Sequence, residues 1–66
     1  MPLFRISSPT GRVFHDDADF DIVLKTVTIP KDQLLAFYCS EVGTVCTFLL
    51  KPGVAGFELL VEKVSD

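Results

Sequence analysis

A chain of 66 residues has room for one domain with a small core, so we expect residues 1–66 to form a single compact unit. A core of this size rarely supplies more than roughly 3–5 kcal/mol of net stability, and small domains often depend also on a disulfide, a metal or a partner subunit. Hydrophobic residues make up 48% of the chain, a high share for so small a body. Part of this apolar surface must therefore stay in contact with water or meet another chain.

The charged residues argue against two classes of partner. Nine acidic residues face six basic ones, which gives a net charge of −3, and the basic residues form neither a run nor a stripe. Binding to nucleic acid draws most of its affinity from clustered positive charge, and an anionic membrane surface also attracts clustered Lys and Arg. We therefore expect neither nucleic acid nor a membrane as a partner.

The two cysteines, Cys39 and Cys46, are separated by six residues. This spacing is not the C-x-x-C of redox enzymes and zinc sites. The chain opens without the basic and apolar segments of a signal peptide, and no apolar run approaches the roughly 20 residues of a transmembrane helix. We expect a cytoplasmic protein with free core thiols, although a disulfide stays open as an alternative because spacing alone does not give its geometry.

A turn signal near the start of the chain predicts a β-hairpin. Residues 8–11 read Ser-Pro-Thr-Gly, with proline at the second and glycine at the fourth position of the turn. Residues 3–7 before this turn and residues 12–15 after it are short strand candidates. A polar break at residues 16–19 follows the hairpin.

The next two segments are predicted as a strand and a helix. Residues 20–28 are rich in Ile, Val and Thr, which favours a strand. The hydrophobic phase changes between Leu24 and Val27, which we attribute to a bulge or to cover on both faces of the sheet. Pro30 then suits the first position of a helix, and Gly43 suits its end. The apolar residues that share one face of this predicted helix are Leu34, Leu35 and Tyr38.

Two more strands are predicted in the last third of the chain, at residues 44–50 and 57–64. The loop of six residues between them is too short for a parallel crossover, so these strands should pair as a hairpin. The predicted order is β-β-β-α-β-β. This order predicts an α+β fold, with an antiparallel sheet of about five strands and one helix packed on one face.

An acidic segment after the hairpin is the candidate metal site. Asp17, Asp19 and Asp21 have the spacing of the first half of an EF-hand calcium loop. Such a loop also needs glycine at its sixth position and glutamate at its twelfth, where this chain has Ile22 and Thr28. The simpler interpretation is a solvated acidic turn, so we expect neither a bound metal nor another cofactor.

His15 is the single histidine, and carboxylates beside it could hold it as a general base. The residues available to such an acid–base or metal-assisted enzyme are His15, Asp16, Asp17, Asp19 and Asp21. The sequence places neither a nucleophile nor an oxyanion hole beside them. The simpler interpretation is therefore a half-exposed histidine at the end of a strand.

Two apolar residues indicate a different function. Phe37 lies about a third of a turn away from the apolar stripe of the predicted helix. Leu60 lies between Glu58 and Glu62 on the outer face of the last predicted strand. One sheet and one helix leave both side chains without cover, and exposed apolar patches mark interfaces. The sequence favours a non-enzymatic interaction module, most simply a twofold homodimer with Phe37 or Leu60 at its interface. Another protein is the second candidate partner, and a small enzyme is the alternative function.

Overall fold

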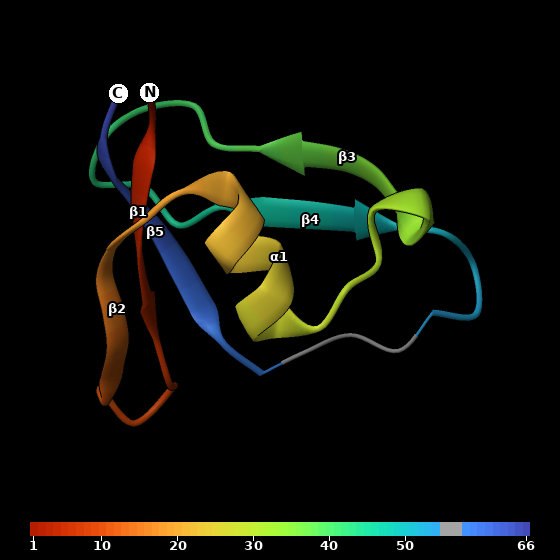
Figure 1. Cartoon of the computed structure of the whole chain (residues 1–66), viewed down its shortest axis with the longest axis horizontal. Coiled ribbons are helices and arrows are strands. Elements are labelled where there is room, and N and C mark those ends of the chain that lie inside the picture. The colour runs from red at the N-terminus through yellow and green to blue at the C-terminus, as the bar shows by residue number, and fades with distance from the viewer. Residues whose placement is uncertain (55–57) are drawn as a thin grey trace.

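The computed structural model describes residues 1–54 and 58–66, and the α+β class predicted from the sequence is confirmed. The elements in chain order are β1 (Leu3–Ser7), β2 (Val13–Ala18), α1 (Phe20–Val27), the short 3-10 helix η1 (Lys31–Gln33), β3 (Leu34–Tyr38), β4 (Thr47–Leu50) and β5 (Leu60–Ser65) (Figure 1). The five strands form two antiparallel sheets, in the orders β2-β1-β5 and β3-β4. The predicted order differs from the observed one because α1 precedes the third strand.

The predicted hairpin between the first two strands is confirmed, although its second strand is longer than predicted. The backbone N–H of Ser8 donates to the carbonyl of Arg12 at 2.8 Å, and that of Gly11 donates to the carbonyl of Ser8 at 3.0 Å. Gly11 has a φ of 98°, which a residue without a Cβ atom adopts without strain. β2 continues to Ala18 through the predicted polar break, and two register shifts against β1 bend it.

The segment predicted as the longest strand is instead the helix α1. Asp19 caps its start, because its side chain accepts a hydrogen bond at 2.9 Å from the backbone N–H of Ile22. Thr28 ends it in the left-handed conformation, and Pro30 follows two residues later. The residues that α1 turns towards the core are Phe20, Val23, Leu24 and Val27. Their spacing of three, one and three residues is helical, and this spacing caused the change of hydrophobic phase that we attributed to a bulge.

The segment predicted as the helix instead forms η1 and β3. In the β3–β4 sheet, Leu34 pairs with Leu50 and Phe37 with Phe48, with a register shift between Leu34 and Ala36. Because of this bulge, Leu34 and Phe37 both pack against the core although they are three residues apart. A strand with such a bulge therefore has the apolar spacing of a helix.

The core lies between α1 and the three-stranded sheet, and the inner face of the β3–β4 sheet closes its side (Figure 1). The side chains that are less than 2% exposed are Phe4, Ile6, Val23 and Val61. Phe37 joins the two sheets, because its ring centroid lies 5.5 Å from that of Phe4 and 4.9 Å from those of Phe20 and Phe48. Phe37 thus faces inward and is partly buried, whereas the sequence argument placed it on the outer face of a helix.

β5 is bounded by β1 on one side and by the segment before β4 on the other. The backbone N–H of Gly43 donates to the carbonyl of Lys63 at 2.8 Å, and that of Cys46 donates to the carbonyl of Val61 at 2.7 Å. The hairpin predicted for the last two strands therefore differs from the structure, since only the residues just before β4 pair with β5. Val61 faces the core and Leu60 faces out, as predicted. Phe57, the first residue of the last predicted strand, and the end of the predicted loop at 55–56 lie outside the described residues.

Candidate functional site

The outer face of the β3–β4 sheet is defined by the alternation of its side chains. Cys46, Phe48 and Leu50 contact the core, so Val45, Thr47 and Leu49 point to the opposite side. In β3, Tyr38 is opposite Thr47 and Ala36 is opposite Leu49, so these residues share that outer side. Leu35 is the bulged residue between Leu34 and Ala36, and it is exposed.

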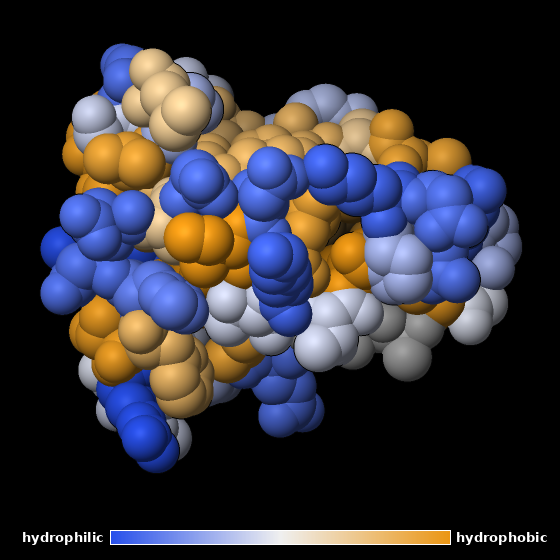
Figure 2. Space-filling view, in the orientation of Figure 1, coloured by the Kyte–Doolittle hydropathy of each residue, from blue (hydrophilic) through white to orange (hydrophobic). Residues whose placement is uncertain are grey.

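Four large apolar side chains on this side are 49% to 60% exposed, namely Leu35, Tyr38, Val45 and Leu49; we call them the β3–β4 outer face. Neither β3 nor β4 contains a charged residue. Apolar atoms gather over the part of the molecule where β3 runs (Figure 2). An uncharged face with an aromatic residue that ends in a hydroxyl is suited to binding another protein surface.

β3 also has a free edge. Within the described part of the chain, only β4 pairs with it, and β3 runs along the outer limit of the molecule (Figure 1). β2, an edge strand of the larger sheet, exposes His15, Asp16 and Asp17 and is bent by its register shifts. Charges and bulges are the usual protection of an edge against further strands. β3 has a single bulge and no charge, so its edge is less protected than that of β2.

Leu60, the second predicted interface residue, lies on the other sheet in charged surroundings. It is 44% exposed, as the sequence argument required. Arg5 forms an ion pair with Glu62 at 3.1 Å and approaches Asp16 at 3.6 Å on the strands beside it. The apolar surface around Leu60 is thus interrupted by charge, in contrast to the β3–β4 outer face.

The acidic residues of the candidate metal or acid–base site do not converge. Asp19 caps α1, Asp16 faces Arg5, and Asp21 forms an ion pair at 2.9 Å with Lys31. The hydrogen bond from Lys31 and its positive charge hold the pKa of Asp21 below its ordinary value of 3.8. Among the described residues, no group of three or more His, Cys, Asp and Glu is placed to hold a metal ion. Asp17 and His15 are exposed on β2.

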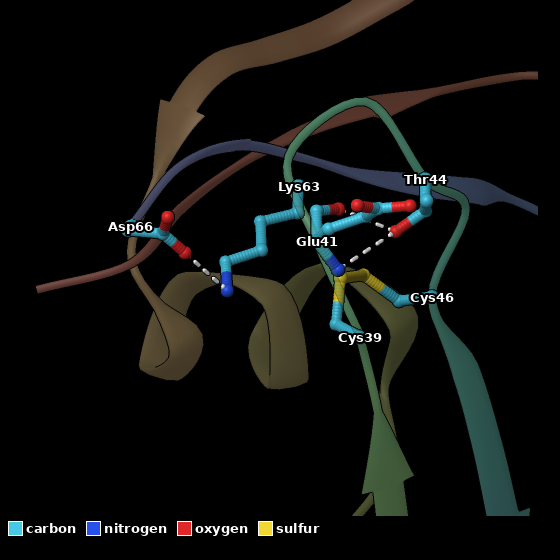
Figure 3. The surroundings of a disulfide bond; sticks show 6 residues. All are labelled: Cys39, Glu41, Thr44, Cys46, Lys63 and Asp66. Carbon is cyan, nitrogen blue, oxygen red and sulfur yellow. Dashed lines mark hydrogen bonds and ion pairs between the residues drawn. A yellow bond between two sulfur atoms is a disulfide. The ribbon is translucent and has the colours of Figure 1, made fainter.

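The two cysteines form a disulfide, so the prediction of free thiols was wrong (Figure 3). Cys39 follows β3, Cys46 precedes β4, and their Cα atoms are 4.6 Å apart. The turn between them is held by hydrogen bonds between Thr44 and Glu41, and Gly43 adopts a φ of 90° in it. Two cysteines at the facing ends of an antiparallel pair are placed to bond. The disulfide was not predicted because a helix before Cys39 would not place the two cysteines at the facing ends of paired strands.

Comparison of the chain with protein-family models, with curated proteins and with solved structures gave no match. No helix in the described ranges has the length and apolar character needed to cross a membrane.

Proposed function

We propose that this chain is a non-enzymatic interaction module that forms a twofold homodimer through the edge of β3 and the β3–β4 outer face. The observation that carries the proposal is an uncharged edge strand beside four exposed apolar side chains. Such an edge is a template for pairing with another strand.

A second copy of the chain suits this edge. An antiparallel strand can pair with its own copy about a twofold axis, and backbone donors at the free edge then meet acceptors of the second copy. Each copy carries a net charge of −3, so two copies repel one another over most of their surfaces. The β3 edge is a place where they meet without opposing like charges, because β3 has none.

The size of the surface indicates that edge and face act together. A standard interface buries about 800 Å² on each partner, which is about a fifth of the 4360 Å² that this chain exposes. One strand edge of five residues is too small to supply that area alone. We therefore expect the dimer to bury Tyr38 and Leu35 along with the edge.

Sedimentation velocity at tens of micromolar tests the proposal. The wild type should have about twice the 7.3 kDa mass of the chain, and Tyr38→Lys should shift it towards the monomer. Leu60→Lys is the matched control, since it adds the same charge on the outer face of the other sheet and should leave the dimer intact. If Leu60→Lys dissociates the dimer and Tyr38→Lys does not, the interface lies on the sheet that contains Leu60. A monomeric wild type would leave another protein as the partner of the exposed face.

Phe37, which the sequence predicted at the interface, is not part of this outer face, because its ring packs against three others. Phe37→Glu would therefore unfold the chain and could not report on the interface. The cytoplasmic location predicted from the sequence is untested, and the Cys39–Cys46 bond is an argument against it, because disulfides persist in oxidising compartments. The acid–base alternative gains no observation in its favour, since Asp16, Asp19 and Asp21 each have a different partner.

A further inference from the structure

A cavity of about 540 Å³ opens at the end of α1, where the chain turns towards η1. Its size is within the range of about 300–1,000 Å³ that small-molecule sites occupy. Leu24, Ile29 and Pro30 contribute its apolar lining, and Lys25, Lys31 and Asp21 lie at its charged margin. The face that carries α1 shows a hollow with apolar atoms inside and hydrophilic atoms around it (Figure 2).

The charges at this cavity oppose the charge of the chain. Two ammonium groups and one carboxylate give a local charge of +1, whereas the whole chain carries −3. Asp21 is committed to Lys31 through the 2.9 Å ion pair. Lys25 forms no ion pair within the described residues, so its ammonium group is available to a ligand.

The end of α1 does not compete for these ammonium groups. Carbonyl groups at a helix C-terminus are partly negative and repel an anion unless they are engaged. Here the carbonyl of Leu24 accepts from the N–H of Ile29, and the carbonyl of Lys25 accepts from the N–H of Thr28, both at 3.3 Å. The carbonyl of Val27 accepts from the hydroxyl of Thr28 at 2.7 Å. A cation therefore finds few free acceptors at this margin, and an anion meets less repulsion.

We propose that this cavity binds a small free monocarboxylate with an apolar body, such as a medium-chain aliphatic acid. The carboxylate would lie between Lys25 and Lys31, and the hydrocarbon body would cover Leu24, Ile29 and Pro30. A compact inorganic anion would leave the apolar lining uncovered, and a neutral lipid would leave the ammonium groups unused. The proposal is independent of self-association through β3.

Titration with sodium octanoate, followed by the backbone amide signals in two-dimensional NMR, tests the site. A flexible ligand of this size should bind with a Kd in the millimolar range. The signals of Lys25, Thr28 and Ile29 should shift together. Octanol supplies the chain without the charge and acetate supplies the charge without the chain, so each should bind more weakly than octanoate.

Three variants test the role of charge, because one should weaken octanoate binding, one should strengthen it and one should leave it unchanged. Lys25→Gln should weaken octanoate binding by about two- to fivefold, the effect of one exposed ion pair. Asp21→Asn should strengthen it by a similar factor, because it frees Lys31 and raises the local charge to +2. Arg12→Gln, the matched control in the β1–β2 turn, should leave the Kd unchanged. The proposal is overturned if octanol binds as tightly as octanoate, if Asp21→Asn fails to tighten binding, or if the shifted signals lie on β3 and β4.

Discussion

The two sheets of this chain differ in how far the rest of the fold buries their side chains. Among the described residues, the four side chains that are less than 2% exposed all lie in the three-stranded sheet and α1. No residue of β3 or β4 is fully buried, and four large apolar side chains in and beside them lie at the surface. A chain of this length has enough apolar residues to cover one sheet well. The β3–β4 sheet must therefore be stabilised by contacts other than burial of both its faces.

Three kinds of contact hold the β3–β4 sheet, which as a two-stranded sheet would be marginal alone. Phe37 packs its ring against Phe4 of the three-stranded sheet and Phe20 of α1. We call the three-stranded sheet with α1 the covered half and the β3–β4 sheet the bare half. The Cys39–Cys46 disulfide fixes the connection between the strands. Backbone hydrogen bonds join residues 43–46 to β5. We therefore predict that the covered half is destabilised most by loss of buried side chains, and the bare half by loss of the contacts that attach it to the rest of the fold.

The largest expected effect comes from Phe4→Ala in the covered half. Removing a fully buried phenylalanine costs about 3–5 kcal/mol, which equals the whole net stability expected for so small a core. We expect circular dichroism to show a largely unfolded chain at 25 °C. Phe14→Ala is the matched control, since Phe14 is exposed on the neighbouring strand and its loss should cost less than about 1 kcal/mol. Similar losses in both variants would contradict the distinction between a buried face and a bare one.

The second effect is on the bare half, through the double variant Cys39→Ala and Cys46→Ala. A link across seven residues restricts the unfolded chain, and its loss should lower the free energy of unfolding by about 2–3 kcal/mol in urea denaturation. Wild type with reductant should match the double variant without it. Amide exchange should accelerate first in β3 and β4. A change of less than 1 kcal/mol would show that Phe37 and β5 hold this sheet without the disulfide.

The class of fold could be predicted from the sequence, but the positions of the helix and the third strand could not. The first hairpin was predictable because a proline–glycine turn sets its geometry locally. α1 was missed because its β-branched residues favour a strand, whereas its cap at Asp19 and its apolar spacing favour a helix. β3 was missed because the bulge at Leu35 gives a strand the apolar spacing of a helix. The pairing of β3 with β4 decides this segment, and that partner lies outside residues 34–38, whose spacing alone was compared with a helix.

The exposure of the candidate surface was predictable only in part. The exposure of Leu60 was predicted correctly, because successive residues of a strand face opposite sides and the neighbouring Val61 is buried. The β3–β4 outer face was not predicted, because it exists only when residues 34–38 form a strand. The cavity margin unites Lys25 with Lys31, which the sequence separates by the end of α1. Sites of this kind depend on the fold and have no local signature.

A smaller effect tests the helix that covers the three-stranded sheet. Asp19→Ala removes the side chain that caps α1, and we expect a loss of about 1 kcal/mol in the free energy of unfolding. Asp17→Ala is the matched control, since this carboxylate is exposed two residues earlier, and its removal should change stability by less than about 0.5 kcal/mol. Urea denaturation of both variants measures the difference. Equal effects would mean that general acidity, and not the cap, stabilises the start of α1.

The smallest effect concerns the ion pair between Asp21 of α1 and Lys31 of η1, which links the covering helix to the segment that leads into β3. Because Lys31 lowers the pKa of Asp21 in the folded state, the pair adds stability above pH about 4. That contribution is lost as the pH falls through the lowered pKa. It should be small, since the two side chains are 68% and 72% exposed.

Carboxyl-carbon NMR of Asp21 measures this pKa directly. In the wild type the titration midpoint should lie below 3.8, and Lys31→Gln should raise it towards that value, because both the hydrogen bond and the charge are lost. Lys25→Gln is the matched control, since Lys25 acts on Asp21 through charge alone and contributes least, so the midpoint should move less. A larger shift from Lys25→Gln would mean that the carboxylate of Asp21 turns towards Lys25. The link between α1 and η1 would then be absent in solution, and the bare half would depend on Phe37, β5 and the disulfide alone.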